Sequence, residues 1–263
     1  MKYQSVNTIV FSPTGKTQIA AKALAESFGT VRQTVDLSQK NTIWQSCSFG
    51  ADDLCIIAVP SFGGRVPHIA KEHLLQMTPQ NSPAILLVSY GARAYDDTLL
   101  ELQDTAVQCG FCPIAAVTAV TEHSICREFA AGRPHAADIQ QLHFFADRIR
   151  ECFTDIPLCS KEVILPLPGN TPYREYHPAP RFSPADPQTC VHCGLCVKNC
   201  PLDAIDPVTL TLKNDSCIGC MRCEALCPVH ARKLPLTVRE KIFSFLQPVC
   251  VNDRENELFL PML

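Results

Sequence analysis

Eight cysteines in the second half of the chain restrict its possible folds more than any other feature. They form two runs with the same spacing, Cys190-x2-Cys193-x2-Cys196-x3-Cys200-Pro201 and Cys217-x2-Cys220-x2-Cys223-x3-Cys227-Pro228. Each cysteine of the first run recurs 27 residues later, and so does the proline. This regularity indicates an internal duplication whose spacing is typical of metal ligands.

Three cysteines two residues apart can bind three corners of one iron-sulfur cube, whereas the fourth is carried by a turn and a proline to the cube of the other repeat. The spacing therefore predicts one [4Fe-4S] cluster on Cys190, Cys193, Cys196 and Cys227, and a second on Cys217, Cys220, Cys223 and Cys200. Zinc is the alternative metal for four thiolates, but zinc ribbons usually pair two CxxC units. The repeated triple spacing favours two cubane clusters over zinc.

Over residues 181 to 235 this pattern resembles the bacterial two-cluster ferredoxins. The resemblance implies a small α+β ferredoxin-like domain that transfers single electrons at low potential.

The first half of the chain alternates β-branched apolar runs with helical segments. Strands are expected at residues 5–12, 30–37, 53–60, 83–91 and 112–122, and helices at 15–28, 67–77, 96–109 and 135–153. This alternation predicts an α/β fold in which a doubly wound, five-stranded parallel sheet has helices on both faces. Ligands of such sheets bind at the carboxyl ends of the strands.

The stretch FSPTGKT, residues 11 to 17, ends like a nucleotide-binding P-loop. A P-loop needs a glycine five residues before Gly15, but that position is Val10, inside the first strand. What remains is a strand, a hydroxyl-rich turn and a helix N-terminus, which together suit a terminal phosphate monoester. We therefore expect this loop to bind a phosphate that is not part of ATP.

This loop resembles the FMN-phosphate loop of the flavodoxin family, and the resemblance extends over residues 4 to 153. The matching residues are Ser12, Thr14, Gly15 and Thr17, while Lys16 occupies a variable position and would add a positive charge near the phosphate. The resemblance implies a flavodoxin-like fold and FMN as cofactor.

Two further loops resemble the isoalloxazine-binding loops of flavodoxins. The residues that this resemblance assigns to the flavin are Pro60, Ser61, Phe62, Gly63 and Gly64 in one loop, and Ser89, Tyr90, Gly91, Arg93, Tyr95 and Asp96 in the other. Phe62 and either Tyr90 or Tyr95 would offer aromatic faces for stacking. Each loop also has a purely structural interpretation, since FGG can form a tight turn and Asp96 or Asp97 can cap a helix.

The two domains are joined by a proline-rich segment. Residues 154 to 189 hold eight of the 21 prolines, which predicts an extended connector, with Tyr173, Tyr176 and Phe182 available to pack it against a domain. The expected organisation is 1–153, a flavodoxin-like FMN-binding domain; 154–180, a connector; 181–235, a ferredoxin-like domain; and 236–263, a C-terminal helix near 236–247 followed by an apolar tail.

Several other groups receive no central role. Cys109 and Cys112 have thioredoxin spacing, but the motif follows a helix and enters a strand, so we interpret both as packed thiols. His123 and Arg133 flank a loop after the last strand and are candidates for contact with the flavin pocket.

The composition limits partners and location. A net charge of -3 without a basic run disfavours nucleic acid, and no apolar run approaches the roughly 18 residues that cross a bilayer. We therefore expect a cytoplasmic protein, in which the sixteen cysteines, eight of them at metal spacing, form no disulfides. The sequence leaves the oligomeric state open.

The whole chain resembles ferredoxins with a fused flavodoxin-type domain, a family known mainly in anaerobic bacteria. The resemblance implies an electron-transfer protein in which FMN exchanges electrons with two [4Fe-4S] clusters and with redox partner proteins. Three hypotheses remain: an electron carrier between partner enzymes, an FMN-dependent reductase of a small acceptor such as a quinone, and a non-catalytic redox sensor.

Overall fold

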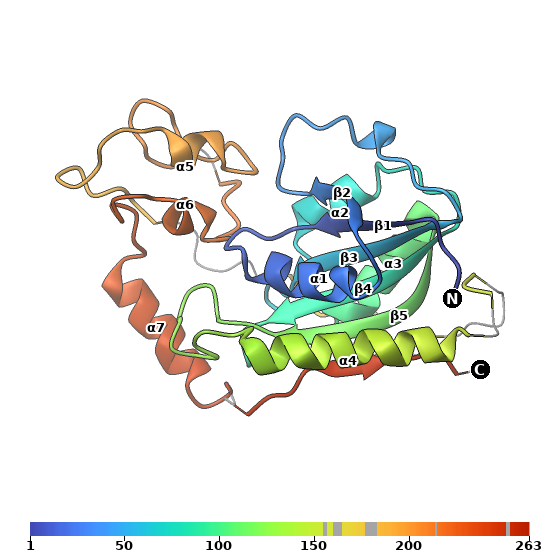
Figure 1. Ribbon diagram of the computed structural model, residues 1–263. Coiled ribbons are helices and arrows are strands. Elements are labelled where there is room, and N and C mark those ends of the chain that lie inside the picture. The colour runs from blue at the N-terminus through green and yellow to red at the C-terminus, as the bar shows by residue number, and fades with distance from the viewer. Residues whose placement is uncertain (155–156, 160–164, 177–182, 214, 251–252, 263) are drawn as a thin grey trace.

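A computed structural model describes residues 1–154, 157–159, 165–176, 183–213, 215–250 and 253–262. The chain forms an α/β domain and, at one end of its sheet, a smaller cysteine-rich domain that carries the two cysteine runs (Figure 1). Parts of the predicted connector, together with Phe182, lie outside the described residues.

All five predicted strands are present and mutually parallel. They are β1 (Ser5–Val10), β2 (Val31–Asp36), β3 (Asp53–Pro60), β4 (Ser82–Tyr90) and β5 (Phe111–Val120). Their order in the sheet is β2-β1-β3-β4-β5. This is the order of the flavodoxin-like doubly wound fold, so the predicted fold class is confirmed.

The sheet has one strand more than predicted. Residues of the C-terminal tail form β6 (Glu257–Phe259), which pairs antiparallel with Thr118 to Ala116 of β5. The pairing covers the edge of β5 that a five-stranded sheet would leave exposed. The apolar tail thus docks on the protein itself.

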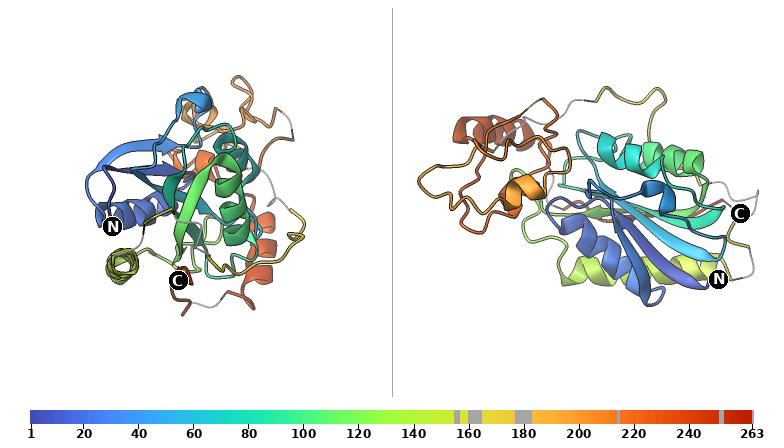
Figure 2. Two further views of the ribbon diagram at one scale, coloured as in Figure 1. Left: turned by 90° about the vertical axis from the view of Figure 1, so that its right-hand side faces the viewer. Right: turned by 90° about the horizontal axis from the view of Figure 1, so that it is seen from above.

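Four helices cover the two faces of the sheet (Figure 2). They are α1 (Lys16–Glu26) and α4 (Ala136–Cys152) on one face, and α2 (His68–Leu74) and α3 (Thr98–Cys109) on the other. A short 3-10 helix, η1 (Trp44–Ser46), lies in the loop between β2 and β3.

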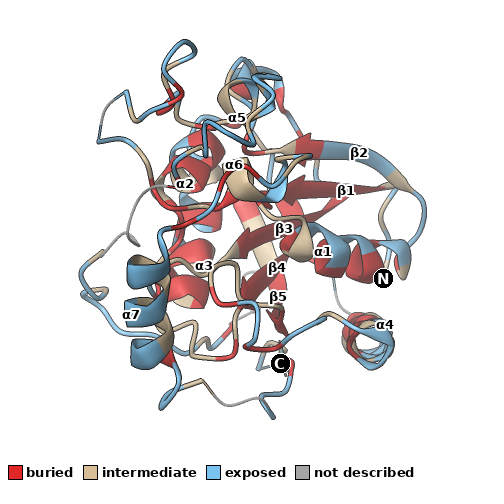
Figure 3. Cartoon of the chain, turned by 90° about the vertical axis from the view of Figure 1, so that its left-hand side faces the viewer, coloured by how far each residue is buried: buried red, intermediate tan, exposed pale blue. Residues whose placement is uncertain are grey.

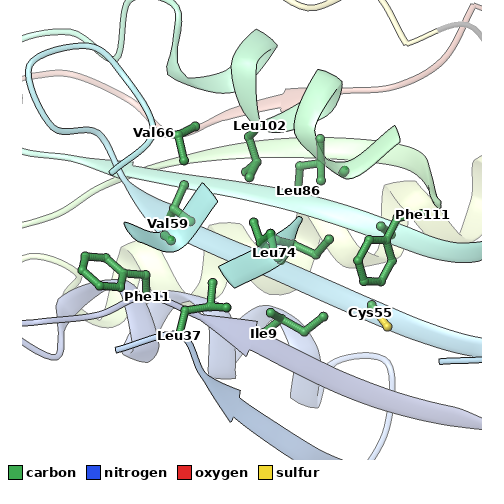
Figure 4. Packing of buried hydrophobic residues seen from close by; sticks show 14 of the residues in the cluster. Ile9, Phe11, Leu37, Cys55, Val59, Val66, Leu74, Leu86, Leu102 and Phe111 are labelled. Atoms are coloured by element: carbon green, nitrogen blue, oxygen red, sulfur yellow. The ribbon is translucent and has the colours of Figure 1, made fainter. Parts of the chain in front are cut away.

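Each face of the sheet has its own apolar core. Leu74 of α2 and Leu102 of α3 pack on alternate residues of β1, β3 and β4, such as Ile9 and Leu86 (Figure 4). All nine residues of β4 are buried, as expected for a central parallel strand covered on both faces.

The connector packs against the α/β domain over residues 165–176. Asp97 accepts hydrogen bonds from the backbone N–H of Asn170 (2.8 Å) and of Arg174 (2.7 Å), and the Tyr173 hydroxyl donates to Asp104 of α3. A side chain at Gly169, where φ is +147°, would lie 2.7 Å from the Leu100 Cβ. The described part of the connector contains no helix or strand, and it is fastened to the first domain.

The cysteine-rich domain has little regular structure. It contains the short helices α5 (Leu195–Lys198) and α6 (Arg222–Ala225) and two isolated antiparallel bridges, Ile205 with Leu212 and Ala185 with Arg232. The predicted C-terminal helix follows as α7 (Leu236–Leu246) and lies against the end of the α/β domain (Figure 3). None of the helices in the described part of the chain is long and apolar enough to cross a membrane.

Candidate functional site

The predicted phosphate loop lies between β1 and α1. Gly15 adopts φ +85° directly before α1, a conformation that favours glycine. The Ser12 hydroxyl accepts a hydrogen bond from the Gln18 N–H (3.0 Å), and the Thr17 hydroxyl is hydrogen-bonded to the Ser89 hydroxyl of β4 (2.8 Å). Two of the predicted hydroxyls therefore fix the shape of the loop.

The loop opens into a small cavity of about 60 Å³, which we call the inner recess. Thr14, Lys16 and Thr17 line it together with residues at the carboxyl ends of β3, β4 and β5. The Lys16 ammonium lies 3.6 Å from the Glu122 carboxylate, which also lines the recess. The predicted positive charge is present there and is partly balanced by Glu122.

A larger cavity of about 530 Å³, the outer pocket, adjoins the inner recess. The two cavities share Ser61, Tyr90, Gly91 and His123. The volume falls in the range of small-molecule sites, roughly 300 to 1,000 Å³. Recess and pocket therefore lie side by side at the carboxyl edge of the sheet, where ligands of this fold bind.

The structure brings most of the predicted flavin-binding residues to these two cavities. Pro60, Phe62 and Ser89 line the inner recess, whereas Gly63, Gly64 and Arg93 line the outer pocket. Of the aromatic candidates, only Tyr90 lines both cavities, because Phe62 turns inward and packs edge-on against Phe11 (6.2 Å between ring centroids).

Tyr95 and Asp96 line neither the recess nor the outer pocket. The Tyr95 ring lies edge-on to Tyr90 at 5.2 Å, and its hydroxyl donates to the Glu257 carboxylate (2.8 Å) at the start of β6. Burial and this carboxylate raise the pKa of Tyr95. Asp96 has φ +44° and its carboxylate pairs with Arg93 and Arg174. Both residues support the loop behind Tyr90.

A buried carboxylate holds the chain after the Pro60 to Gly64 loop in place. Glu101 of α3, 2% exposed, accepts hydrogen bonds from Arg65 (2.7 and 2.8 Å), the Val66 N–H (2.9 Å) and Lys71 (3.0 Å). Burial alone would raise the pKa of Glu101, but these donors hold it below its usual value. Glu101 therefore stays ionised and ties the residues after Gly64 to α3.

His123 lines both cavities, as the sequence suggested. Its Nδ1 accepts hydrogen bonds from the N–H groups of Ile125 (3.2 Å) and Cys126 (3.0 Å). Burial, assisted by the Arg93 charge, lowers the pKa of His123 to about 4, so the ring is neutral at pH 7 and carries its proton on Nε2. A Cβ at Gly91 would lie 2.5 Å from the His123 ring, which explains the glycine at that position.

Arg133, the other candidate in this loop, lies elsewhere. Its guanidinium pairs with the buried Asp138 carboxylate of α4 and donates to the Arg254 carbonyl oxygen (2.6 Å). Arg133 therefore anchors the C-terminal tail and is not part of either cavity lining.

The sequence analysis missed the contribution of α7. One face of this helix lines the outer pocket through Val238, Lys241, Ile242, Phe245 and Leu246. The apolar periodicity of α7 indicates an amphipathic helix, but no local signal tells what its apolar face contacts.

The first predicted set of cluster ligands surrounds one cavity. Cys190, Cys193, Cys196 and Cys227 line it together, although Cys227 belongs to the second run. The exchange of the fourth cysteine between the runs, predicted from the spacing, is thus present in the arrangement of the side chains.

The second set is also close together. Burial, together with the neighbouring thiols Cys223, Cys200 and Cys217, raises the pKa of Cys220 to about 12. Because thiolates repel one another, four of them would share such a site only around a metal cation. The donor set of both sites therefore fits cubane clusters.

Two equivalent backbone hydrogen bonds support this fit. The Ala204 N–H donates to the Cys200 Sγ (3.3 Å), and the Ala231 N–H, 27 residues later, donates to the Cys227 Sγ (3.2 Å). Such bonds stabilise thiolate sulfur in iron-sulfur sites.

The cysteine-rich domain meets the α/β domain at the inner recess. Cys220, of the second ligand set, lines the recess together with Thr14, Thr17 and Phe62. The preceding Ile218 is buried in the core on the α2/α3 face of the sheet, and Arg222 lies 3.6 Å from Asp36 at the end of β2. One candidate cluster site therefore borders the candidate phosphate site.

Cys109 and Cys112 lie outside these sites. Gly110 ends α3 with φ +103°, the Cys109 Sγ donates to the Leu74 carbonyl oxygen (3.1 Å), and Cys112, the second residue of β5, lies beside Cys159. Burial raises the pKa of Cys109 to about 11. This environment agrees with the interpretation as packed thiols.

Comparison with known proteins identifies the C-terminal part. Residues 189–231 match the model of the family described as "4Fe-4S dicluster domain". No curated protein sequence matches the chain.

Several solved structures resemble part of the chain at low identity. A flavodoxin from Streptococcus pneumonia TIGR4 is 17% identical, with 56% of this chain and 99% of that chain covered and a TM-score of 0.40. An archaeal flavodoxin is 13% identical, with 56% and 97% covered and a TM-score of 0.37. The rubredoxin oxygen:oxidoreductase of the anaerobe Desulfovibrio gigas is 19% identical, with 58% and 37% covered and a TM-score of 0.41.

The strand order and the family match define the class of protein. The chain joins an α/β domain with the flavodoxin-like strand order to an iron-sulfur domain. The iron-sulfur part is a 4Fe-4S dicluster domain, as the cysteine spacing predicts.

Proposed function

We propose that the chain is an electron-transfer flavo-iron-sulfur protein, which passes electrons between FMN and two [4Fe-4S] clusters. FMN exchanges one or two electrons and each cluster exchanges one, so the combination can connect two-electron donors with one-electron carriers. The observation that carries the proposal is the position of Cys220, a predicted cluster ligand, in the wall of the inner recess.

The proposal gives each of the two neighbouring cavities a role. The loop from Ser12 to Thr17 would hold the FMN phosphate in the inner recess, and the flavin ring would lie in the outer pocket beside Tyr90 and under α7. His123 is neutral, and its Nε2–H would donate a hydrogen bond to FMN at the border between the recess and the pocket. Because α7 lines the outer pocket, it would limit the access of water to the ring.

The proposal includes partners and a location. Redox partner proteins would deliver and remove the electrons, and the many free thiols suit a cytoplasmic environment.

The first test is composition. After anaerobic reconstitution, we expect about eight irons, about eight sulfides and one FMN per chain. Zinc in place of iron would overturn the dicluster assignment, and the absence of flavin would overturn the FMN assignment.

The second test is electron transfer within the chain. On rapid mixing with a donor that reduces the flavin, we expect flavin absorbance to recover as the cluster signal in electron paramagnetic resonance rises. Cys217→Ser should remove the cluster nearest the flavin and slow this exchange at least tenfold. Cys152→Ser, at the end of α4, is the matched control and should leave the exchange unchanged. Equal rates in wild type and Cys217→Ser would refute a direct path from flavin to this cluster.

A second function is favoured by the size and lining of the outer pocket. Its wall is mainly apolar and ends at the exposed Phe245, so a small apolar acceptor such as a quinone could enter beside the flavin. This reductase activity would appear as steady turnover of a quinone. Phe245→Ala should alter the turnover rate. Cys217→Ser should not abolish turnover when electrons are supplied directly to the flavin.

A further inference from the structure

The two halves of the cysteine-rich domain differ at one buried position. Each run continues after Cys-Pro with two residues and an alanine, and the next residue is Ile205 in the first repeat and Arg232 in the second. Both side chains are buried, at 5% and 2% exposed, and each residue forms an isolated antiparallel bridge. An arginine therefore occupies a position in which the other repeat has an apolar side chain.

The surroundings of Arg232 place its charge beside one cluster site. Arg232 lines the cavity of Cys190, Cys193, Cys196 and Cys227. Its guanidinium donates to the carbonyl oxygens of Ser183 and Leu210, both at 2.9 Å, and Leu210 lines the same cavity. These two neutral acceptors fix the orientation of the guanidinium beside the cavity.

Other charged groups lie around this position. The Glu224 carboxylate accepts hydrogen bonds from the Ser183 hydroxyl (3.0 Å) and the Leu234 N–H (3.1 Å). Glu224 follows Cys223, a predicted ligand of the second cluster, and therefore lies close to the second cluster site. The Arg232 charge also reaches Cys223, where it opposes the burial that raises the pKa of that thiol. Lys233, the next residue, is exposed to solvent.

We propose that Arg232 raises the reduction potential of the cluster bound by Cys190, Cys193, Cys196 and Cys227 above that of the cluster bound by Cys217, Cys220, Cys223 and Cys200. Reduction adds one negative charge to a site, and a buried positive charge stabilises it more than a solvated one. One electron leaves the second site and one arrives at the first, with no bond formed or broken. This inference rests on the proposed function, because it requires both clusters.

The test is a potentiometric titration of the reconstituted full chain, with dithionite as reductant and electron paramagnetic resonance as readout. Arg232→Gln removes the charge but keeps an amide donor for a carbonyl. We expect it to lower the higher of the two midpoint potentials clearly and the other one less. Arg232→Lys should retain most of the wild-type separation, and Lys233→Gln, which removes an exposed charge next to it, should shift neither midpoint.

The midpoints are assigned with Cys193→Ser, which changes a ligand of the first site only and should alter the signal of the higher-potential cluster. If Arg232→Gln does not bind both clusters, Arg232→Ile replaces it, because isoleucine is accommodated at the equivalent position of the first repeat. Unchanged midpoints, or equal shifts in Arg232→Gln and Lys233→Gln, would overturn the proposal. Loss of both clusters in both neutral variants would also overturn it, since Arg232 would then serve assembly. A wild-type chain without eight irons would instead count against the proposed function.

Discussion

Replacing Glu101 by glutamine should destabilise the α/β domain by about 3 kcal/mol. The substitution keeps the size of the side chain but leaves the partly buried cations of Arg65 and Lys71 without their shared carboxylate. Breaking a buried ion pair from one side costs roughly 3 to 5 kcal/mol, and the partial exposure of Lys71 places the expected value at the lower end.

The assay is urea unfolding of the cofactor-free chain, because bound cofactors would add their own stabilisation. Trp44, the only tryptophan, is buried in the α/β domain and stacks on His73, so its fluorescence reports the unfolding of this domain. With a slope of about 2 kcal/mol per molar urea, the midpoint should fall by about 1.5 M.

The matched control is Glu26→Gln, which makes the same chemical change in an exposed pair with Lys22 at 3.6 Å. Exposed pairs one helical turn apart contribute about 0.3 to 0.5 kcal/mol, so this midpoint should hardly move. If Glu101→Gln and Glu26→Gln shift the midpoint equally, the Glu101 network does not stabilise the fold and the argument is wrong.

The pH dependence of the stability of wild type and of Glu101→Gln gives a second check. Since the folded pKa of Glu101 is below its unfolded value, its stabilisation is complete above the unfolded pKa, about 4.3, and is lost as the pH falls through the folded pKa. Wild type and Glu101→Gln should therefore differ most near pH 7 and converge in acid. A difference that grows on acidification would contradict this sign.

Three further predictions concern other parts of the chain. Thr17→Val, which keeps the shape but leaves the buried Ser89 hydroxyl without its partner, should weaken FMN binding at least tenfold in a fluorescence titration while the iron content stays constant. Asn256→Ala removes the acceptor of the Val120 N–H (2.8 Å) and should release the C-terminal tail, seen as faster proteolysis after residue 250 and about 1 to 3 kcal/mol lower stability. Cys109, with its pKa raised to about 11, should react with iodoacetamide at pH 8 much more slowly than an unhindered thiol, because only about 0.1% of it is thiolate; rapid labelling would contradict the interpretation as a packed thiol.

The sequence predicts the parts of this molecule that depend on local patterns. The apolar runs of β3 and β4 and the glycine that ends α3 determine their elements through neighbours in the chain. The exchange of Cys200 and Cys227 between the two ligand sets also follows from a spacing within 38 residues.

The parts that sequence reasoning missed depend on contacts between distant segments. β6 exists because Glu257 to Phe259 reach β5, about 140 residues earlier, and nothing local marks a three-residue strand. The choice between Tyr90 and Tyr95 as the aromatic lining of the pocket has the same origin, because Glu257 holds the Tyr95 hydroxyl and keeps that ring behind Tyr90. Likewise, α7 lines the outer pocket only because the cysteine-rich domain sits at the carboxyl end of the sheet.

The two cluster sites differ in their surroundings in a way that gives the proposed path a direction. Cys220 lines the inner recess, whereas Cys193 is exposed beside the exposed Val191. A partner protein can therefore approach the site of Cys193 closely, while the α/β domain borders the site of Cys220. If Arg232 makes the exposed site the easier one to reduce, electrons that enter at the flavin collect where a partner can remove them. Lowering the potential of the exposed site in Arg232→Gln should then slow reduction of an external one-electron acceptor without slowing oxidation of the flavin by the nearer cluster.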